Sequence, residues 1–325
     1  TEYNLNPPIF SAKQMKVTEE LCGIPAFSPS GLFACGDVNG KIHSQVMDGG
    51  KVTYDDFVGF KTYSSSLKNR FKPLFDVKKS GKTLLSYLTY IDDFKLLAIS
   101  NKSQVIIRDA NIYIDSADSF WMTPPDVCNN SIADYNFRSF QILHSTGKSM
   151  AHIFDIETQQ KLTDIRISRV NIQNMKWLRS YSTLFYIAQD DLSFYDSREK
   201  NAVAKIVGAG HDLVNCNSSI STPLNLITAY NKSVSMIDMR MMAKLPNSIN
   251  TQYPIQQFEV HQHLPFAVGI LNNKLQSFSF EVENQLDSPE EQDLNGIPDA
   301  FELHPTEASC AVRIGNKIQC VIIDY

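Results

Sequence analysis

The sequence predicts an all-β chain folded as a seven-bladed β-propeller. A short turn phrase followed by an alternating apolar strand occurs seven times along its 325 residues. The turns read, for example, Asn39-Gly40, Asn273-Lys274 and Asn316-Lys317, and Asn-Gly is a strong hairpin signal. The apolar residues that open the following strands stand at positions 42, 105, 150, 192, 234, 275 and 318. Their separations of 63, 45, 42, 42, 41 and 43 give a period near 42, which is typical of a propeller.

Each repeat shows the same internal order of elements. An apolar strand leads to a turn, then to a second strand, the tight turn and a third alternating strand. Ala26-Phe27-Ser28-Pro29 begins the first repeat, and Ala300 to Pro305 begins the last in the same way. The fourth strands are less regular, as outer strands that pair on one side can be. They are expected at Val52–Phe57, Asn111–Asp115, Gln160–Ile165, Ala202–Val207 and Ala243–Pro246.

Two third strands end in a pattern that points to a known family. Tyr195-Asp196-Ser197-Arg198 and Ile237-Asp238-Met239-Arg240 resemble the Trp-Asp-x-Arg ending of a WD40 repeat, and Gly210-His211 resembles the Gly-His that opens one. The chain thus resembles a divergent WD40 propeller, with Tyr195 and Ile237 in place of the usual tryptophans. By period, the resemblance covers nearly the whole chain.

The resemblance implies how the ring is closed. Residues 1–325 are interpreted as one domain whose last repeat ends just after a third strand. In WD40 propellers an N-terminal strand completes that blade, and residues 12–17 could supply it here. The seventh blade would then be shared between residues 296–325 and about 10–20.

Three stretches interrupt the rhythm and are candidate binding loops, because function on a rigid scaffold gathers in loops. Residues 59–79 are basic, residues 115–130 hold Trp121 and Met122, and residues 281–295 are acidic and include Glu290, Glu291 and Asp293. Aromatic residues and Met are enriched at interface anchors. Trp121 could equally fold back over the core, and each of the three stretches could be a plain connector.

Composition narrows the classes of function. The net charge of -5 argues against a general nucleic-acid binder, so nucleic acid is expected only indirectly, through a complex. Thr1–Phe10 lacks a signal-peptide pattern, no run of apolar residues is long enough to span a membrane, and the six cysteines form no C-x-x-C motif. These features favour an intracellular protein, nuclear or cytoplasmic, with reduced cysteines, no membrane partner, no cofactor and no metal.

Candidate chemistry is sparse. His261-Gln262-His263 could be a metal pair, but His261 occupies the same strand-to-turn position as His304, which favours a structural role. Asp190-Asp191 falls on the recurring tight turn. The innermost strands carry no distinctive chemistry, so neither an active site nor a small-molecule substrate is expected in the channel.

The sequence therefore predicts a non-catalytic scaffold, a propeller subunit of a larger intracellular complex whose partners are other protein subunits. The alternative is a substrate receptor of a ubiquitin ligase. In the WD40 family, an Arg pair on consecutive blades, here Arg198 and Arg240, often marks docking to the DDB1-type adaptor of cullin-4 ligases. The same arginines could instead be structural and pair with the preceding Asp.

Overall fold

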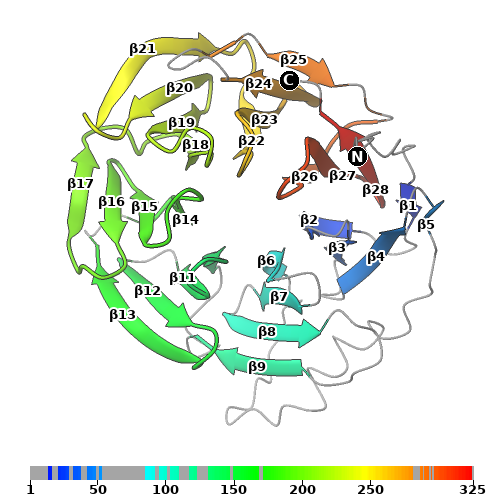
Figure 1. Ribbon diagram of the computed structural model, residues 1–325, viewed down its shortest axis with the longest axis horizontal. Coiled ribbons are helices and arrows are strands. Elements are labelled where there is room, and N and C mark those ends of the chain that lie inside the picture. Colours follow the sequence, from blue (N-terminus) through cyan, green and yellow to red (C-terminus); the bar gives the residue numbers. More distant parts are fainter. Residues whose placement is uncertain are drawn as a thin grey trace, which may run out of the picture.

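The computed structural model arranges short antiparallel sheets around a central axis, with the first strand of most repeats nearest the centre (Figure 1). The structure describes residues 14–16, 21–28, 32–37, 42–48, 51–52, 85–91, 95–100, 103–109, 117–122, 131–146, 149–167, 171–280, 286–287, 289–292, 294 and 296–323. All described regular elements are strands, and the prediction of an all-β propeller is confirmed.

The described strands form seven four-stranded sheets. In sheet order their strands are β2 (Leu21–Phe27), β3 (Leu32–Asp37), β4 (Ile42–Asp48), β5 (Lys51–Val52); β6 (Leu85–Tyr90), β7 (Lys95–Ser100), β8 (Gln104–Asp109), β9 (Ala117–Trp121); β10 (Ile132–Asn136), β11 (Gln141–Ser145), β12 (Met150–Asp155), β13 (Gln160–Arg166); β14 (Asn174–Trp177), β15 (Leu184–Ala188), β16 (Leu192–Asp196), β17 (Ala202–Ile206); β18 (Leu213–Asn217), β19 (Asn225–Tyr230), β20 (Ser233–Asp238), β21 (Ala243–Asn250); β22 (Ile255–Val260), β23 (Phe266–Leu271), β24 (Lys274–Ser279), β25 (Glu290–Gln292); and β26 (Ala300–Leu303), β27 (Ser309–Ile314), β28 (Lys317–Ile322), β1 (Gln14–Lys16).

One sheet joins the two ends of the chain. β1 pairs antiparallel with β28, and Gln14, Met15 and Lys16 lie opposite Gln319, Ile318 and Lys317. This strand falls within residues 12–17, the segment proposed from the sequence for this position.

The recurring tight turns join the second and third strands. Leu271 pairs with Lys274 across Asn272 and Asn273, both of which have positive φ. Asn tolerates this left-handed conformation, and such two-residue turns match the twist of the strands they connect. Asp190-Asp191 also lies in the turn between a second and a third strand, as expected, but this turn has three residues, because Ala188 pairs with Leu192.

Two outer strands differ from expectation. The fourth strand expected at Asn111–Asp115 is instead β9, where Phe120 lies opposite Val105 and packs partly buried on the core. Packing of this aromatic side chain on the core explains why β9 forms at residues 117–121, which the alternating pattern of apolar residues did not indicate. Within the acidic stretch, Glu290–Gln292 forms β25, because Gln292 is buried and its amide donates to the Ser277 hydroxyl.

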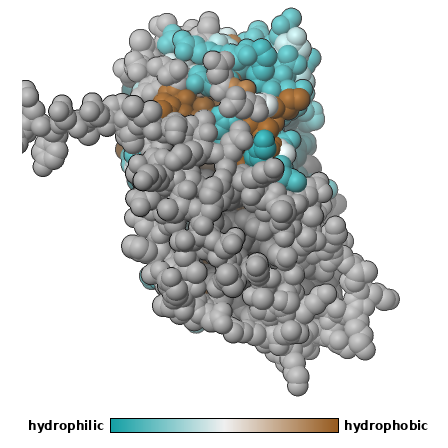
Figure 2. Space-filling model, turned by 90° about the vertical axis from the view of Figure 1, so that its right-hand side faces the viewer, coloured by the Kyte–Doolittle hydropathy of each residue, from teal (hydrophilic) through white to brown (hydrophobic). Residues whose placement is uncertain are grey.

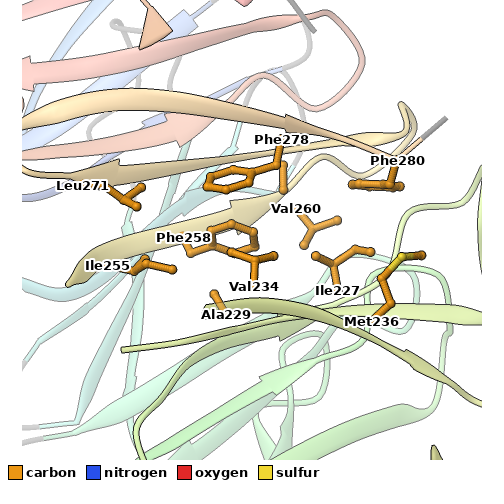
Figure 3. Close-up of a cluster of buried hydrophobic side chains, with 11 residues drawn as sticks. Ile227, Ala229, Val234, Met236, Ile255, Phe258, Val260, Leu271, Phe278 and Phe280 are labelled. Atoms are coloured by element: carbon orange, nitrogen blue, oxygen red, sulfur yellow. The ribbon is translucent and has the colours of Figure 1, made fainter. Parts of the chain in front are cut away.

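The core lies between neighbouring sheets rather than within one. In Figure 3, side chains from β19 and β20 meet those from β22, β23 and β24. Phe258 and Phe278 make an edge-to-face contact there, with ring centroids 5.6 Å apart. Five similar clusters join other pairs of neighbouring sheets, including one that brings β2 and β3 against β27 and β28. Most of the described sheets are therefore stabilised by both of their neighbours.

Polar side chains of the inner strands add a second set of links between sheets. Asp134 accepts the Trp177 backbone N–H (2.7 Å), and the Asn174 amide donates to the Val214 carbonyl (2.7 Å). The Gln257 side chain both donates to and accepts from the Phe301 backbone, at 2.6 and 3.1 Å. Such bonds between inner strands fix the spacing of the side chains that surround the axis.

Candidate functional site

Two cavities follow the axis, and residues of the inner strands line both. Each has a volume of about 230 Å³. One lies at the ends of these strands and is lined by Phe27, Tyr90, Phe137, Val260 and Leu303. The other lies nearer their beginnings. Arg179, Glu259 and Glu302 line both cavities and so stand between them.

Charged side chains gather at this position in the channel, although the sequence predicted inner strands without distinctive chemistry. Lys176 pairs with Glu259 at 2.5 Å. The buried Asp134 carboxylate accepts the Tyr87 hydroxyl at 3.1 Å as well as the Trp177 N–H. Arg179 and Glu302 complete a cluster of two basic and three acidic side chains. Four of the five side chains come from inner strands, and Arg179 lies just after the inner strand β14.

Burial shifts the proton affinities of these groups. It raises the pKa of Glu302 to about 8, assisted by the negative charge of Glu259 and opposed by Arg179 and Lys176. Burial likewise raises the pKa of Asp134, although Arg179 and Lys176 oppose the shift. Burial lowers the pKa of Arg179, but its acidic neighbours outweigh this and leave the pKa above its usual value. At neutral pH Arg179 is charged and Glu302 is largely protonated.

A signal for this cluster exists in the sequence. Glu259 stands two residues before His261, and Glu302 stands two residues before His304. The matching positions place the two carboxyl groups on equivalent sites of neighbouring inner strands, β22 and β26. Alignment of the repeats therefore could have identified Glu259 and Glu302 as a pair, although a single Glu within an apolar strand is not by itself a sign of a site.

The loops after β16 and β20 carry the two predicted rim arginines in matching geometry. Arg198 donates to both oxygens of Asp196, Nε to Oδ1 at 2.8 Å and Nη2 to Oδ2 at 2.6 Å. Arg240 does the same with Asp238, at 3.0 and 2.7 Å. These bonds lower the pKa of each aspartate to about 2. The aspartates are nearly buried, while the Arg198 and Arg240 side chains are 74% and 56% exposed. Each arginine therefore pairs with its aspartate and is still accessible to a partner.

Exposed apolar residues lie at the same end of the sheets. The residue after each third strand donates to the residue before the second: Ile156 to Phe140, Ser197 to Thr183 and Met239 to Leu224. These bonds bring the two kinds of loop together on one face. Neighbouring loops also touch there, because the Tyr181 hydroxyl donates to the Pro223 carbonyl.

We call this surface the arginine face and define it by Phe140, Arg198, Leu224, Arg240 and Met241. The exposed fractions of its apolar members are 42% for Phe140, 44% for Leu224 and 64% for Met241. The cavity lined by Phe27 and Tyr90 ends among loops of the same face, at Phe137, Gln262 and Thr306. The arginines are recognisable from the Asp-x-Arg pattern in the sequence, but the apolar residues are not, because their exposure depends on the loops packed beside them. By contrast, the described surface on the side shown in Figure 2 is mostly hydrophilic.

The other predicted contact residues lie apart from this face. Trp121 ends strand β9. Met122 is 7% exposed and packs among core residues such as Leu97 and Ile99, so its expected place at an exposed contact is wrong. Burial of its apolar side chain between sheets is the reason. Glu290 and Glu291 are exposed on the edge strand β25, where Glu291 pairs with Lys274. Asp293 and the basic residues 59–79 lie outside the described residues.

The histidine motif has the structural role that its repetition indicated. His261 Nδ1 accepts the backbone N–H groups of His263 (3.1 Å) and Leu264 (2.9 Å), and its Nε2 lies 3.0 Å from the Glu307 carbonyl. His304 Nδ1 accepts the N–H of Glu307 at 2.9 Å in the same way. Within the described part of the chain, no group of three or more His, Cys, Asp or Glu side chains is arranged to hold a metal ion. Nor do the described residues contain a helix with the length and hydrophobicity needed to cross a membrane.

Comparison with known proteins finds similarity in the fold alone. No protein-family model matches the chain, and a search of curated proteins gives no match. A chain from the crystal structure of the mitotic checkpoint complex superposes with a TM-score of 0.71 at 9% identity, covering 96% of this chain and 91% of that one. Raptor from Chaetomium thermophilum superposes with a TM-score of 0.70 at 16% identity, covering 96% of this chain and 29% of that one. These neighbours are WD40 propellers, so the resemblance drawn from the repeat endings extends to the three-dimensional fold.

Proposed function

We propose that this chain is a non-catalytic scaffold, a propeller subunit of a larger assembly, and that it binds a protein partner through the arginine face. The observation that carries the proposal is the combination of Phe140, Leu224 and Met241 with two exposed arginines on one face. Interface cores favour Met, aromatic residues and Arg. One of the structural neighbours comes from a complex named as such, the mitotic checkpoint complex, which is consistent with this role.

The state of the arginines supports a preorganised surface. Each guanidinium is held by two bonds to an aspartate two residues earlier in the chain. The side chains are therefore fixed before a partner arrives, and less conformational entropy is lost on binding. A partner that presents apolar residues together with acidic or carbonyl groups would complement this face.

Affinity purification with matched variants tests the proposal. The wild-type chain should recover a stoichiometric protein partner. A Leu224→Glu, Met241→Glu double variant should lose that partner, because two charges would be placed in the apolar part of the interface. Val203→Glu is the control, since Val203 is 53% exposed on the outer strand β17, away from this face. Retention of the partner by the double variant, with an unchanged melting temperature, would refute the assignment of the face.

A second candidate is docking to the DDB1-type adaptor of cullin-4 ubiquitin ligases, and it is favoured by the equivalence of the two arginine loops. Arg198 and Arg240 have the same contacts on neighbouring sheets. Arg198→Glu with Arg240→Glu should abolish adaptor pull-down while the protein stays folded. If the double variant fails to fold, the arginines are structural.

We further propose that residues 1–325 form one seven-bladed domain in which each four-stranded sheet is a blade and β1 completes the last. The pairing of β1 with β28 supports this closure. Cys216, Cys310 and Cys320 are buried thiols that form no disulfide with a described residue, which supports an intracellular location, nuclear or cytoplasmic.

A further inference from the structure

The channel contains a cation whose hydrogen-bonding groups are unmatched. The Arg179 guanidinium offers five N–H donors, yet it makes no hydrogen bond and no ion pair with any described residue. Only its backbone N–H is engaged, with Asn217 Oδ1 at 2.7 Å. Nearby acids offset the charge of Arg179 and keep its pKa above the usual value, but they leave its side-chain N–H donors without hydrogen bonds. Donors in such a half-buried position are usually matched by an acceptor of a ligand or of water.

The nearby acids are already committed. Both oxygens of Asp134 accept hydrogen bonds, from the Tyr87 hydroxyl and the Trp177 N–H. Glu259 pairs with Lys176. Glu302 makes no side-chain hydrogen bond to the described residues, and at neutral pH it carries its proton, which makes it a donor. The side chains of Arg179 and Glu302 thus present donors to the same space, and neither forms a hydrogen bond with a described residue.

We propose that the cavity at the arginine-face end of the channel binds a carboxylate group, with Arg179 and the Glu302 carboxyl group as its hydrogen-bond donors. Guanidinium and carboxylate match in shape and can form two parallel bonds. The rest of the ligand would be apolar, because Phe27, Tyr90 and Val260 line the same cavity. With about 230 Å³ available, the cavity suits a small organic acid or the C-terminal residue of a peptide.

Binding of phenylacetate tests the chemistry, measured by calorimetry and by the melting temperature. We expect a Kd of about 1 mM or tighter, given the affinity that a ligand of this size can reach. 2-Phenylethanol has the same apolar body without the charge and should bind at least about tenfold more weakly, since a hydrogen bond between charged groups is lost. To separate the sources, a short peptide that ends in Phe is compared with its C-terminal amide. Tighter binding of the free-acid peptide than of phenylacetate assigns the site to a peptide terminus, and the reverse assigns it to a small acid.

Variants locate the site. Arg179→Met should weaken phenylacetate binding by about tenfold or more. Arg166→Met is the control, because Arg166 is exposed on the outer strand β13. The affinity of the wild-type protein for phenylacetate should fall above about pH 8, because Glu302 then loses its proton and becomes negative beside Glu259 and Asp134. Glu302→Gln should remove that fall, because the amide of Gln keeps an N–H donor and cannot ionise.

These measurements can overturn the proposal in separate ways. Absence of phenylacetate and peptide binding to the wild-type protein would refute it, as would equal affinity for 2-phenylethanol. If Arg179→Met does not fold, the pH profiles of wild type and Glu302→Gln decide, and identical profiles would count against the site. The proposal does not depend on the scaffold function, because the channel residues are distinct from those that define the arginine face.

Discussion

Two glycines that lie two residues apart offer a sharp test of the turn built around Asp190 and Asp191. A Cβ atom at Gly210 would lie 2.3 Å from the Asp191 carbonyl oxygen and 2.6 Å from that of Gln189, both of them backbone atoms. Separations below 3.0 Å are essentially never seen for real Cβ atoms, so Gly210→Ala must displace the turn. Gly208 is the matched control, because its φ is +69° but nothing lies within 4 Å of the Cβ position.

The magnitudes differ because the two causes differ. Overpacking usually costs about 1–3 kcal/mol, and a clash with fixed backbone belongs at the upper end, so we expect about 3 kcal/mol for Gly210→Ala. A left-handed conformation alone costs Gly208→Ala about 1 kcal/mol. For a chain of 325 residues, the entropy of unfolding converts these energies into losses of about 4 °C and about 1.5 °C in melting temperature.

Differential scanning calorimetry of the two variants at one pH gives the comparison. Both sites lie at the end of the sheets opposite the arginine face, so partner binding should be unchanged in each folded variant. A melting temperature for Gly210→Ala that equals or exceeds that of Gly208→Ala would show that the close approach of the Gly210 backbone to the turn is wrong.

Three further predictions concern the ring and its core. Deletion of residues 1–20 removes β1 and leaves β28 unpaired on one side, so the melting temperature should fall; a truncated protein that melts like the full chain would contradict the closure. Phe278→Ala should cost about 3–5 kcal/mol in urea denaturation, because the side chain is fully buried between two sheets, and a cost below about 1 kcal/mol would contradict that packing. Burial lowers the pKa of His261 to about 4, so the unfolded chain binds a proton below about pH 6.5 that the folded chain does not, and stability should fall as the pH falls from about 6.5 to about 4. His261→Asn should make this fall shallower, as followed by urea denaturation across that range, and an unchanged slope would argue against a buried neutral imidazole.

The sequence was most informative where a local conformation has a local cause. The Asn272-Asn273 turn and the turn at Asp190-Asp191 require residues that suit tight turns, and the matching residues repeat along the chain. The paired Asp-x-Arg endings could be read for the same reason, since each bond spans only two residues.

Features that depend on distant packing were not accessible in this way. β9 forms where Phe120 can be buried, and that burial depends on residues of the neighbouring sheet. The exposure of Met241 and the burial of Met122 follow from what covers each one, although both residues have the same chemistry. The charged cluster of the channel combines Asp134, Arg179 and Glu302, which are far apart in the chain and meet only when the ring has formed.

The pairing of Met15 with Ile318 has a consequence for how the protein is made. About 300 residues separate the two partners, and translation at about 5–20 residues per second delivers the second only about 15–60 s after the first. Throughout that interval the nascent chain holds a strand whose partner does not yet exist. The intermediate sheets can assemble as they emerge from the ribosome, but β1 can pair only after β28 has been made. The N-terminal strand is then the place where a growing chain is most open to a wrong partner, including the same strand of a neighbouring chain.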